Sequence, residues 1–334
     1  MNYPKAEIKP VPIKPHVVGK QLSDLSVVAY YPKYWDIKPD PTDEAFWSGD
    51  MLRALIPLLG NVTFAEVDSG IIEDNKGYFD PLDDVSFDIG WEVCARPRRK
   101  IAKWVFGMVS DFVGREDAMD KWMADGHLDA VFTLRCVSQR LREQCAKYKL
   151  PLYSFPYFVV GERPYNEDKN IDAAMIGTRG KGYNWRQKMY PVLAKMSNVY
   201  EMLLHEAGGK NGRIPYTEYM ETMGRIKYFF SGGVDDGDWD TAQIPAKHIE
   251  ACAAGACLVS PTLPMMDSCG FIDGVNFIQL NNVNEIPDIL SSDAWREISK
   301  AGYKLINERH SVEARAQQIL ETCYGKADSS LCLS

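Results

Sequence analysis

The chain has 334 residues, of which 46% are hydrophobic and 25% are charged, a composition typical of a soluble globular protein with room for two domains. Its formal net charge of −8 disfavours a protein that binds nucleic acids nonspecifically. The eight cysteines form no CxxC pair and no metal-ligand spacing with the five histidines, and no segment is apolar enough for a signal peptide or a membrane span, so we expect a cytoplasmic protein with reduced thiols.

The first half of the chain alternates between strand-like and helix-like patterns. Buried strands are predicted at Ser26–Trp35, Val62–Asp68, Leu128–Leu134 and residues 151–160. Helices are predicted between them, at residues 46–60, 98–125 and 136–149. The acidic, turn-rich residues 71–86 have no clear period. Strands that alternate with helices indicate a doubly wound parallel sheet.

The alternation restarts after the polar segment Gly161–Asn170, which has the composition of a linker. Strands are predicted from Ile171, at residues 198–204, at Ile226–Phe230 and at Ala256–Ser260. Helices are predicted at residues 185–196, 216–224, 245–255, 284–291, 292–307 and 311–325. The sequence therefore predicts two Rossmann-like domains joined near residue 165.

Glu250 is a carboxylate in an unusual position, inside a short helix between the two strands of a predicted βαβ unit, residues 225–261. Its neighbours are small or apolar, so a charge there is costly unless a partner binds it. Pairing with Lys247, or a solvated helix face, would give Glu250 a purely structural role. A ligand with two hydroxyls, such as a nucleotide ribose, would instead bind both carboxylate oxygens, and both interpretations stay open at this point.

The loop before this helix is rich in aspartate and glycine. Residues 234–240 contain DGD and DWD, which are similar to the acidic triads that hold a metal ion on a nucleotide diphosphate. Acidic loops are usually solvated and the spacing of a calcium loop is incomplete, so we expect no metal site. Gly232 and Gly233 directly follow a strand, where they would let backbone amides approach an anion closely.

A second glycine-rich loop, within residues 176–188, carries the cations Arg179, Lys181, Arg186 and Lys188. It is neither a GxGxxG fingerprint nor a P-loop. Guanidinium groups bind phosphate oxygens in a bidentate manner, so this cluster is suited to a pyrophosphate. The alternative is a solvated start of a helix.

The histidines have no catalytic partner in the sequence. His127 precedes a predicted strand, His248 shares a helix with Glu250, and His310 begins the last helix. A structural role is therefore favoured for each. No GxSxG, HExxH or Cys/His arrangement is present, which disfavours hydrolytic and protease chemistry.

Three stretches of the second half resemble the C-terminal signature of group 1 glycosyltransferases, most closely the CgeB-like branch. They are PAKHIEACAAGACLVSP (245–261), DGVNFIQLNNVNEI (273–286) and ISKAGYKLINERHSVEARAQQIL (298–320). The resemblance covers residues 225–322 and extends more loosely back to residue 172. The N-terminal half matches only in its alternating pattern.

This resemblance implies the GT-B fold, an α/β fold with two doubly wound Rossmann-like domains facing each other across a cleft. The implied parts are an acceptor-side domain (1–162), a nucleotide-sugar-binding domain (163–310) and a C-terminal helix that crosses back to the first domain (311–334). The resemblance implies that Glu250 holds the donor ribose. It also implies that the loop from Gly232 to Pro245, which includes Ile244, lines the diphosphate and sugar, and that Arg179 and Lys181 bind the diphosphate. Many relatives have a second glutamate where this chain has Ala242, which leaves the sugar and its contacts undefined.

Together these inferences predict a glycosyltransferase that moves a sugar from a nucleotide-diphosphate-sugar donor to a hydroxyl acceptor. A helix N-terminus and basic side chains can stabilise the leaving diphosphate, so we expect no metal and no cofactor. Relatives in this group commonly retain the anomeric configuration, and Asp50 and His127 are the candidate catalytic residues of the first domain.

The acceptor stays open as a glycan, a small molecule or a modified DNA base, the last because residues 96–100 form a compact basic patch. Alternative functions are an epimerase or phosphorylase of the same fold, or a protein that binds nucleotide-sugars without turnover.

Overall fold

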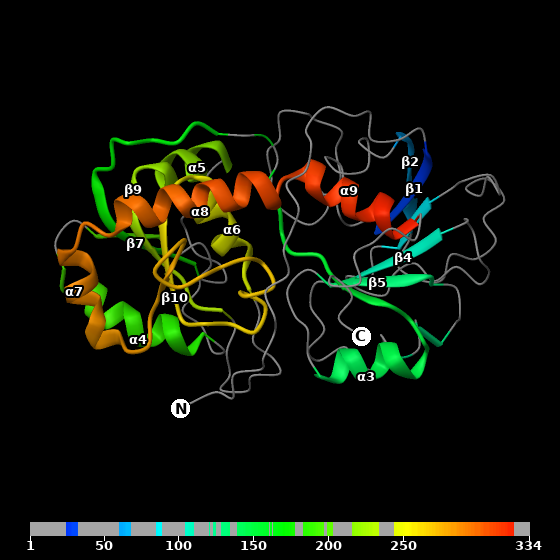
Figure 1. The fold of residues 1–334 in the computed structure, drawn as a ribbon, viewed down its shortest axis with the longest axis horizontal. Coiled ribbons are helices and arrows are strands. Elements are labelled where there is room, and N and C mark those ends of the chain that lie inside the picture. Colours follow the sequence, from blue (N-terminus) through cyan, green and yellow to red (C-terminus); the bar gives the residue numbers. More distant parts are fainter. Residues whose placement is uncertain are drawn as a thin grey trace. The chain divides into compact units, whose positions relative to one another are not determined.

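The computed structural model describes residues 25–32, 60–67, 85–88, 104–109, 120, 123–124, 128–133, 139–159, 161, 163–177, 183–196, 199–202, 216–233 and 244–323. The chain divides into two compact units, whose elements are labelled in Figure 1. The N-terminal unit contains the described residues up to Tyr157 together with those from Val312 onward. The C-terminal unit contains the described residues from Phe158 to Ser311. Each unit has a parallel sheet with helices, so the predicted α/β class is confirmed.

The N-terminal unit has a six-stranded parallel sheet in the order β2-β1-β3-β4-β5-β6. Its strands are β1 (Leu25–Pro32), β2 (Gly60–Val67), β3 (Val85–Asp88), β4 (Trp104–Val109), β5 (Ala130–Thr133) and β6 (Leu152–Ser154). Two of its helices are α3 (Gln139–Lys147) and α9 (Val312–Cys323). The strands predicted near residues 26, 62 and 128 are confirmed, whereas the helix predicted at 46–60 lies outside the described residues.

The helix predicted across residues 98–125 is wrong for residues 104–109, which form strand β4. The sequence WVFGMV is a continuous apolar run, and a buried parallel strand lacks the alternation that separates strands from helices. Phe106 of β4 is buried and packs edge-on against Phe132 of β5, with ring centroids 5.2 Å apart. The short strand β3 also falls in a region without a predicted strand. It forms because it pairs with β1 on one side and β4 on the other.

The C-terminal unit has a five-stranded parallel sheet in the order β11-β10-β9-β7-β8. Its strands are β7 (Ile171–Ile176), β8 (Val199–Met202), β9 (Ile226–Phe230), β10 (Cys257–Ser260) and β11 (Ile278–Gln279). Its helices are α4 (Asn184–Leu193), α5 (Tyr216–Gly224), α6 (Ala246–Ala253), η3 (Val283–Glu285), α7 (Ile286–Ser291) and α8 (Trp295–Arg309). The strand and helix predictions for this half are confirmed. The order is that of a doubly wound sheet whose topological switch point lies between β7 and β9.

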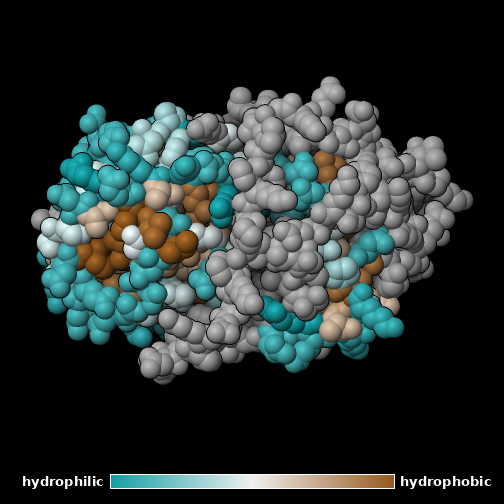
Figure 2. Space-filling view, viewed as in Figure 1, coloured by the Kyte–Doolittle hydropathy of each residue, from teal (hydrophilic) through white to brown (hydrophobic). Residues whose placement is uncertain are grey.

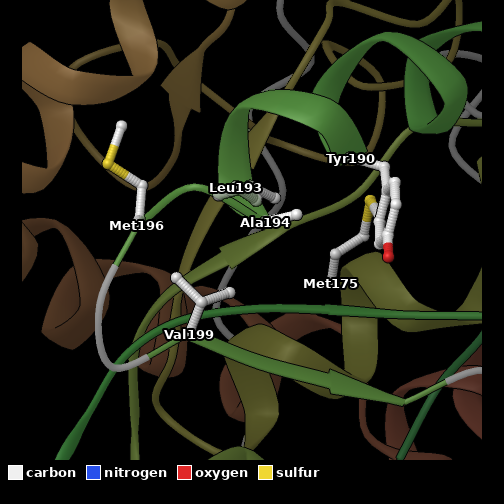
Figure 3. A pocket seen from close by; sticks show the side chains of 6 residues that line it. All are labelled: Met175, Tyr190, Leu193, Ala194, Met196 and Val199. Carbon is white, nitrogen blue, oxygen red and sulfur yellow. The ribbon is translucent and has the colours of Figure 1, made fainter.

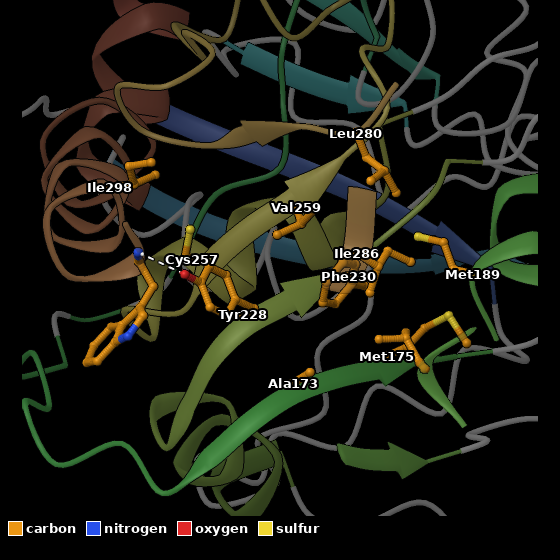
Figure 4. Close-up of a cluster of buried hydrophobic side chains, with 12 residues drawn as sticks. Ala173, Met175, Met189, Tyr228, Phe230, Cys257, Val259, Leu280, Ile286 and Ile298 are labelled. Atoms are coloured by element: carbon orange, nitrogen blue, oxygen red, sulfur yellow. Dashed lines mark hydrogen bonds between the residues drawn. The ribbon is translucent and has the colours of Figure 1, made fainter. Parts of the chain in front are cut away.

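Alternate residues of the three central strands form a core on one face of this sheet (Figure 4). The strand residues are Ala173, Met175, Tyr228, Phe230, Cys257 and Val259. Met189 of α4, Ile286 of α7 and Ile298 of α8 pack against them. The Tyr228 hydroxyl also donates a hydrogen bond to the Ser292 carbonyl oxygen at 2.8 Å. This packing holds the C-terminal ends of β7, β9 and β10 in fixed relative positions.

The polar residues 163–170 are fixed along the C-terminal unit. The Tyr165 hydroxyl lies 2.7 Å from the Ser299 hydroxyl, and Glu167 forms an ion pair with Lys300 at 3.0 Å. A polar, proline-containing composition suits a free linker and also a segment whose polar side chains bond to a neighbouring helix. Here the second arrangement is observed.

Lys169, at the end of this segment, is a buried cation whose ammonium donates to the Gly224 carbonyl oxygen at 3.0 Å. Burial lowers its pKa from 10.5 to about 8. Between these two pH values the unfolded chain binds this proton more strongly, so the free energy of unfolding should rise with pH. The unfolding free energy of the wild type should therefore rise relative to that of Lys169→Met as the pH increases from 8 to 10.5. Lys195→Met, which removes an exposed lysine, is the control, and a constant difference for Lys169→Met would contradict the pKa shift.

The visible surface of the C-terminal unit is mostly hydrophilic, with hydrophobic side chains gathered in one area (Figure 2). Among the described residues, the exposed large hydrophobic side chains are Ile272 and Val275. They belong to a loop that Asn276 holds, because Oδ1 of Asn276 accepts from the Ile272 backbone N–H and Nδ2 donates to the Gly270 carbonyl oxygen. Within the described ranges, no helix has the length and apolar character needed to cross a membrane.

Candidate functional site

The C-terminal ends of β7 and β9 mark the place where doubly wound sheets bind ligands. Gly177 directly follows β7, and Ser231 and Gly232 follow β9. Helix α4 leaves β7 and helix α6 leaves β9, so both helices begin at this edge of the sheet. Backbone N–H groups at the start of a helix have no partner within the helix and favour anions.

Gly232 permits a close contact between the end of β9 and the start of α4. A Cβ atom on Gly232 would lie 2.7 Å from Cβ of Trp185, a separation that real Cβ atoms do not reach. Packing therefore requires glycine at this position. The roles of Gly232 and the neighbouring buried Gly233 toward an anion remain predictions.

Two cationic side chains approach Gly177 from different helices. A Cβ atom on Gly177 would lie 2.8 Å from Nη1 of Arg186 in α4 and 3.4 Å from Cε of Lys247 in α6. Arg186 is buried, and its guanidinium carbon lies 4.2 Å from the centre of the Tyr183 ring. Burial lowers the pKa of Arg186, but a guanidinium keeps its charge at neutral pH. The structure thus places positive charge at the end of β7.

Glu250 is buried in α6, as the sequence predicts, with 5% of its surface exposed. The hydroxyl of Tyr219 in α5 donates a hydrogen bond to Oε2 of Glu250 at 2.7 Å. Burial raises the pKa of Glu250, while the charge of Lys247 and the hydrogen bond from Tyr219 oppose that rise. A carboxylate held in this way can accept hydrogen bonds from the hydroxyls of a ligand.

His248 faces the end of β10. Its Nε2 lies 2.7 Å from the Ser260 hydroxyl oxygen. That hydroxyl donates to the Pro261 carbonyl oxygen at 2.8 Å, so Nε2 carries the proton and donates to Ser260. Burial, reinforced by the charge of Arg186, lowers the pKa of His248 to about 3. The imidazole is therefore neutral at physiological pH, which supports the predicted structural role.

Sequence reasoning included Arg186 among the cations of its loop but treated Lys247 only as a structural partner of Glu250. Lys247 and Glu250 are three residues apart in α6, and this spacing is the signal that places them on one face of the helix. Tyr219 was missed because it is 31 residues from Glu250 and joins it only through the contact between α5 and α6.

The structure describes only part of the predicted site. Ile244 is buried, and Pro245 stands at the N-cap of α6 in an extended conformation. Outside the described residues lie Asp50, His127, Arg179, Lys181 and the acidic loop 234–243 with Ala242. Among the residues that are described, no three His, Cys, Asp or Glu side chains are grouped to hold a metal ion.

A separate cavity of about 280 Å³ lies between α4 and strands β7 and β8 (Figure 3). Its lining residues are Met175, Tyr190, Leu193, Ala194, Met196 and Val199. These side chains are almost entirely apolar. None of these side chains carries a charge, so the cavity offers no ion pair to a nucleotide diphosphate.

Comparison with known proteins identifies a related family for much of the C-terminal unit. Residues 165–321 match the family model described as glycosyl transferase-like. No curated protein matches the chain in sequence. The narrower resemblance to the CgeB-like branch remains a prediction.

Several solved structures share the fold at low sequence identity. Sucrose-phosphate synthase from Thermosynechococcus elongatus has a TM-score of 0.58 at 11% identity, over 90% of this chain and 98% of that one. Anabaena HepE, solved with UDP-glucose, has a TM-score of 0.52 at 12% identity, over 90% and 100%. TarM has a TM-score of 0.52 at 11% identity over 73% of this chain, and the match spans only 56% of TarM. The chain therefore has the predicted GT-B fold, and the match to the glycosyl transferase-like family model covers most of the C-terminal unit and continues into α9 of the N-terminal unit.

Proposed function

We propose that this protein is a glycosyltransferase that moves a sugar from a nucleotide-diphosphate-sugar donor to a hydroxyl group of an acceptor. The observation that carries the proposal is the presence of buried Glu250 with the cations Arg186 and Lys247 at the switch point of a glycosyl transferase-like unit. Such a donor has ribose hydroxyls that suit the carboxylate and a diphosphate that suits the cations. The structure of HepE with UDP-glucose supports this class of donor for the fold.

The donor would lie across the ends of β7 and β9. Its ribose would contact Glu250, and its diphosphate would lie near Gly177, where Arg186 and Lys247 meet. The first turn of α6, which begins at Ala246, would direct backbone N–H groups toward the same anion. Arg179 and Lys181 would add charge from the neighbouring loop.

In the transfer, the bond between the anomeric carbon and the diphosphate oxygen breaks, and the acceptor oxygen bonds to that carbon while its proton passes to a base. Negative charge accumulates on the departing diphosphate. Arg186, Lys247 and the N-terminus of α6 would stabilise that charge, so we propose transfer without a metal ion. Asp50 and His127 are the candidate bases, and retention of the anomeric configuration is part of the proposal.

A thermal-shift screen with UDP-glucose, UDP-N-acetylglucosamine, GDP-mannose and ADP-glucose tests the donor site. At a donor concentration 100 times its Kd, binding adds about 2.7 kcal/mol to the unfolding free energy. At least one donor should therefore raise the melting temperature of the wild type, and Arg186→Met should remove most of that rise. Lys195→Met is the control, because Lys195 is exposed just after the C-terminal end of the same helix, outside the predicted cation cluster.

Two outcomes would contradict the donor site: no donor stabilises the wild type, or Arg186→Met responds as the wild type does. Release of free nucleotide diphosphate from the stabilising donor then separates an enzyme from a protein that only binds nucleotide-sugars. Release of an epimerised sugar without any acceptor would indicate an epimerase.

A further inference from the structure

We propose that Tyr219 is a positioning residue that orients the Glu250 carboxylate toward the donor ribose. This inference rests on the proposed function and deepens it, because it assigns a residue of α5 to recognition of the ribose. Tyr219 would act through Glu250 and would not itself touch the reacting atoms.

The contact is short and protected from water. The Tyr219 hydroxyl donates to Oε2 of Glu250 at 2.7 Å, and both side chains are more than nine-tenths buried. A phenol held by the packing of α5 against α6 fixes the plane of the carboxylate, whose terminal torsion is otherwise broad. A hydrogen bond to a charged acceptor is also stronger than one between neutral groups.

The contact makes the two carboxylate oxygens unequal. Oε2 already accepts one hydrogen bond from the protein, so Oε1 keeps more of its capacity to accept from a ligand. The 2′ and 3′ hydroxyls of a ribose should therefore contribute unequally to affinity. A carboxylate free to rotate would accept from both in a more symmetrical manner.

The contact also affects the protonation state of Glu250. Burial favours the neutral acid, whereas the Tyr219 hydroxyl and the charge of Lys247 favour the carboxylate that ribose hydroxyls need. Arg186 of α4 also interacts electrostatically with Tyr219. Loss of the Tyr219 hydroxyl should therefore raise the pKa of Glu250 further and move ribose recognition to higher pH.

Calorimetric titration with uridine diphosphate and its 2′-deoxy and 3′-deoxy forms tests this role from pH 5.5 to pH 8.5. Wild type should bind the ribonucleotide about tenfold more tightly than at least one deoxy form. Tyr219→Phe should weaken ribonucleotide binding about tenfold, leave the weaker deoxy form nearly unchanged, and so remove the discrimination. Because the two forms share the same phosphates, their affinity ratio reports on the ribose site alone.

Tyr165→Phe is the matched control. It removes a hydroxyl that also makes a 2.7 Å contact, with Ser299, away from the site, and it should leave the discrimination unchanged. Glu250→Gln identifies the source of discrimination, and the double variant with Tyr219→Phe should lose less than the sum of the two single losses.

The outcomes separate the two proposals. If wild type binds none of the uridine nucleotides and no donor stabilises it in the thermal-shift screen, the proposed function fails. If Glu250→Gln removes the discrimination but Tyr219→Phe keeps both the ratio and its pH dependence, only the role of Tyr219 is overturned. Wild type supplies a measurement that does not depend on the folding of a variant, because its ribose discrimination should be no greater at the acidic end of the pH range than at the alkaline end. A discrimination that increases as the pH falls would contradict a carboxylate as the group that holds the ribose, and would overturn the positioning role with it.

Discussion

Glu250→Gln is expected to stabilise the protein at neutral pH while it weakens donor binding. Burial raises the pKa of Glu250 above its ordinary value of 4.5, so the folded protein favours the neutral acid. The stability contributed by this group is fully present below pH 4.5 and is lost as the pH rises through the raised pKa. A neutral glutamine avoids that loss, and its amide oxygen can still accept from Tyr219. Each kcal/mol recovered should raise the melting temperature by about 2–4 °C.

The same change should weaken nucleotide binding by about 10- to 100-fold, because a hydrogen bond to a charged group contributes about 1.5–3 kcal/mol. Melting curves at pH 4 and pH 8, with titration of the stabilising nucleotide-sugar, measure both effects. Glu221→Gln, an exposed position in α5, should change neither. If wild type and Glu250→Gln differ in melting temperature by the same amount at both pH values, and bind the nucleotide-sugar equally well, Glu250 is not part of the donor site.

Gly177→Ala is expected to reduce both stability and donor affinity. Gly177 has φ +130°, a conformation that residues with a Cβ atom rarely adopt, and such strain costs about 1–3 kcal/mol. The new methyl group would lie 2.8 Å from Nη1 of Arg186. The end of a flexible side chain can move at little cost in stability, but its movement takes the guanidinium away from its position at β7. Denaturant unfolding and donor titration report the two effects separately.

Gly274→Ala is the matched control for this pair of effects. Gly274 also has a positive φ, +71°, but a Cβ atom there would meet no heavy atom within 4 Å. Gly274→Ala should therefore lose stability and keep its donor affinity. Equal losses of affinity in both variants would show that Gly177→Ala acts through general destabilisation and not through Arg186.

The limits of prediction from the sequence are clear in two strands of the N-terminal unit. Residues 104–109 are apolar throughout, and only their pairing with β3 and β5 shows that they form a strand. β3 has four residues, too few to show a period, and it exists because two neighbouring strands supply its hydrogen-bond partners. In the C-terminal unit, glycine or proline follows β7, β9 and β10 within two residues, and the positions of these strands follow from the sequence.

The candidate site divides in the same way. The sequence alone identified a buried carboxylate at Glu250, because small and apolar residues surround it, and a cluster of cations that includes Arg186. It also indicated the GT-B fold through motifs that are local in the chain. Only the tertiary structure showed that Arg186 and Lys247 meet at Gly177 and that Tyr219 bonds to Glu250. Local sequence patterns reflect interactions within one segment of the chain. The contacts of the site instead join the end of β7 with α4, α5 and α6, and their geometry depends on how these elements pack together in the folded unit.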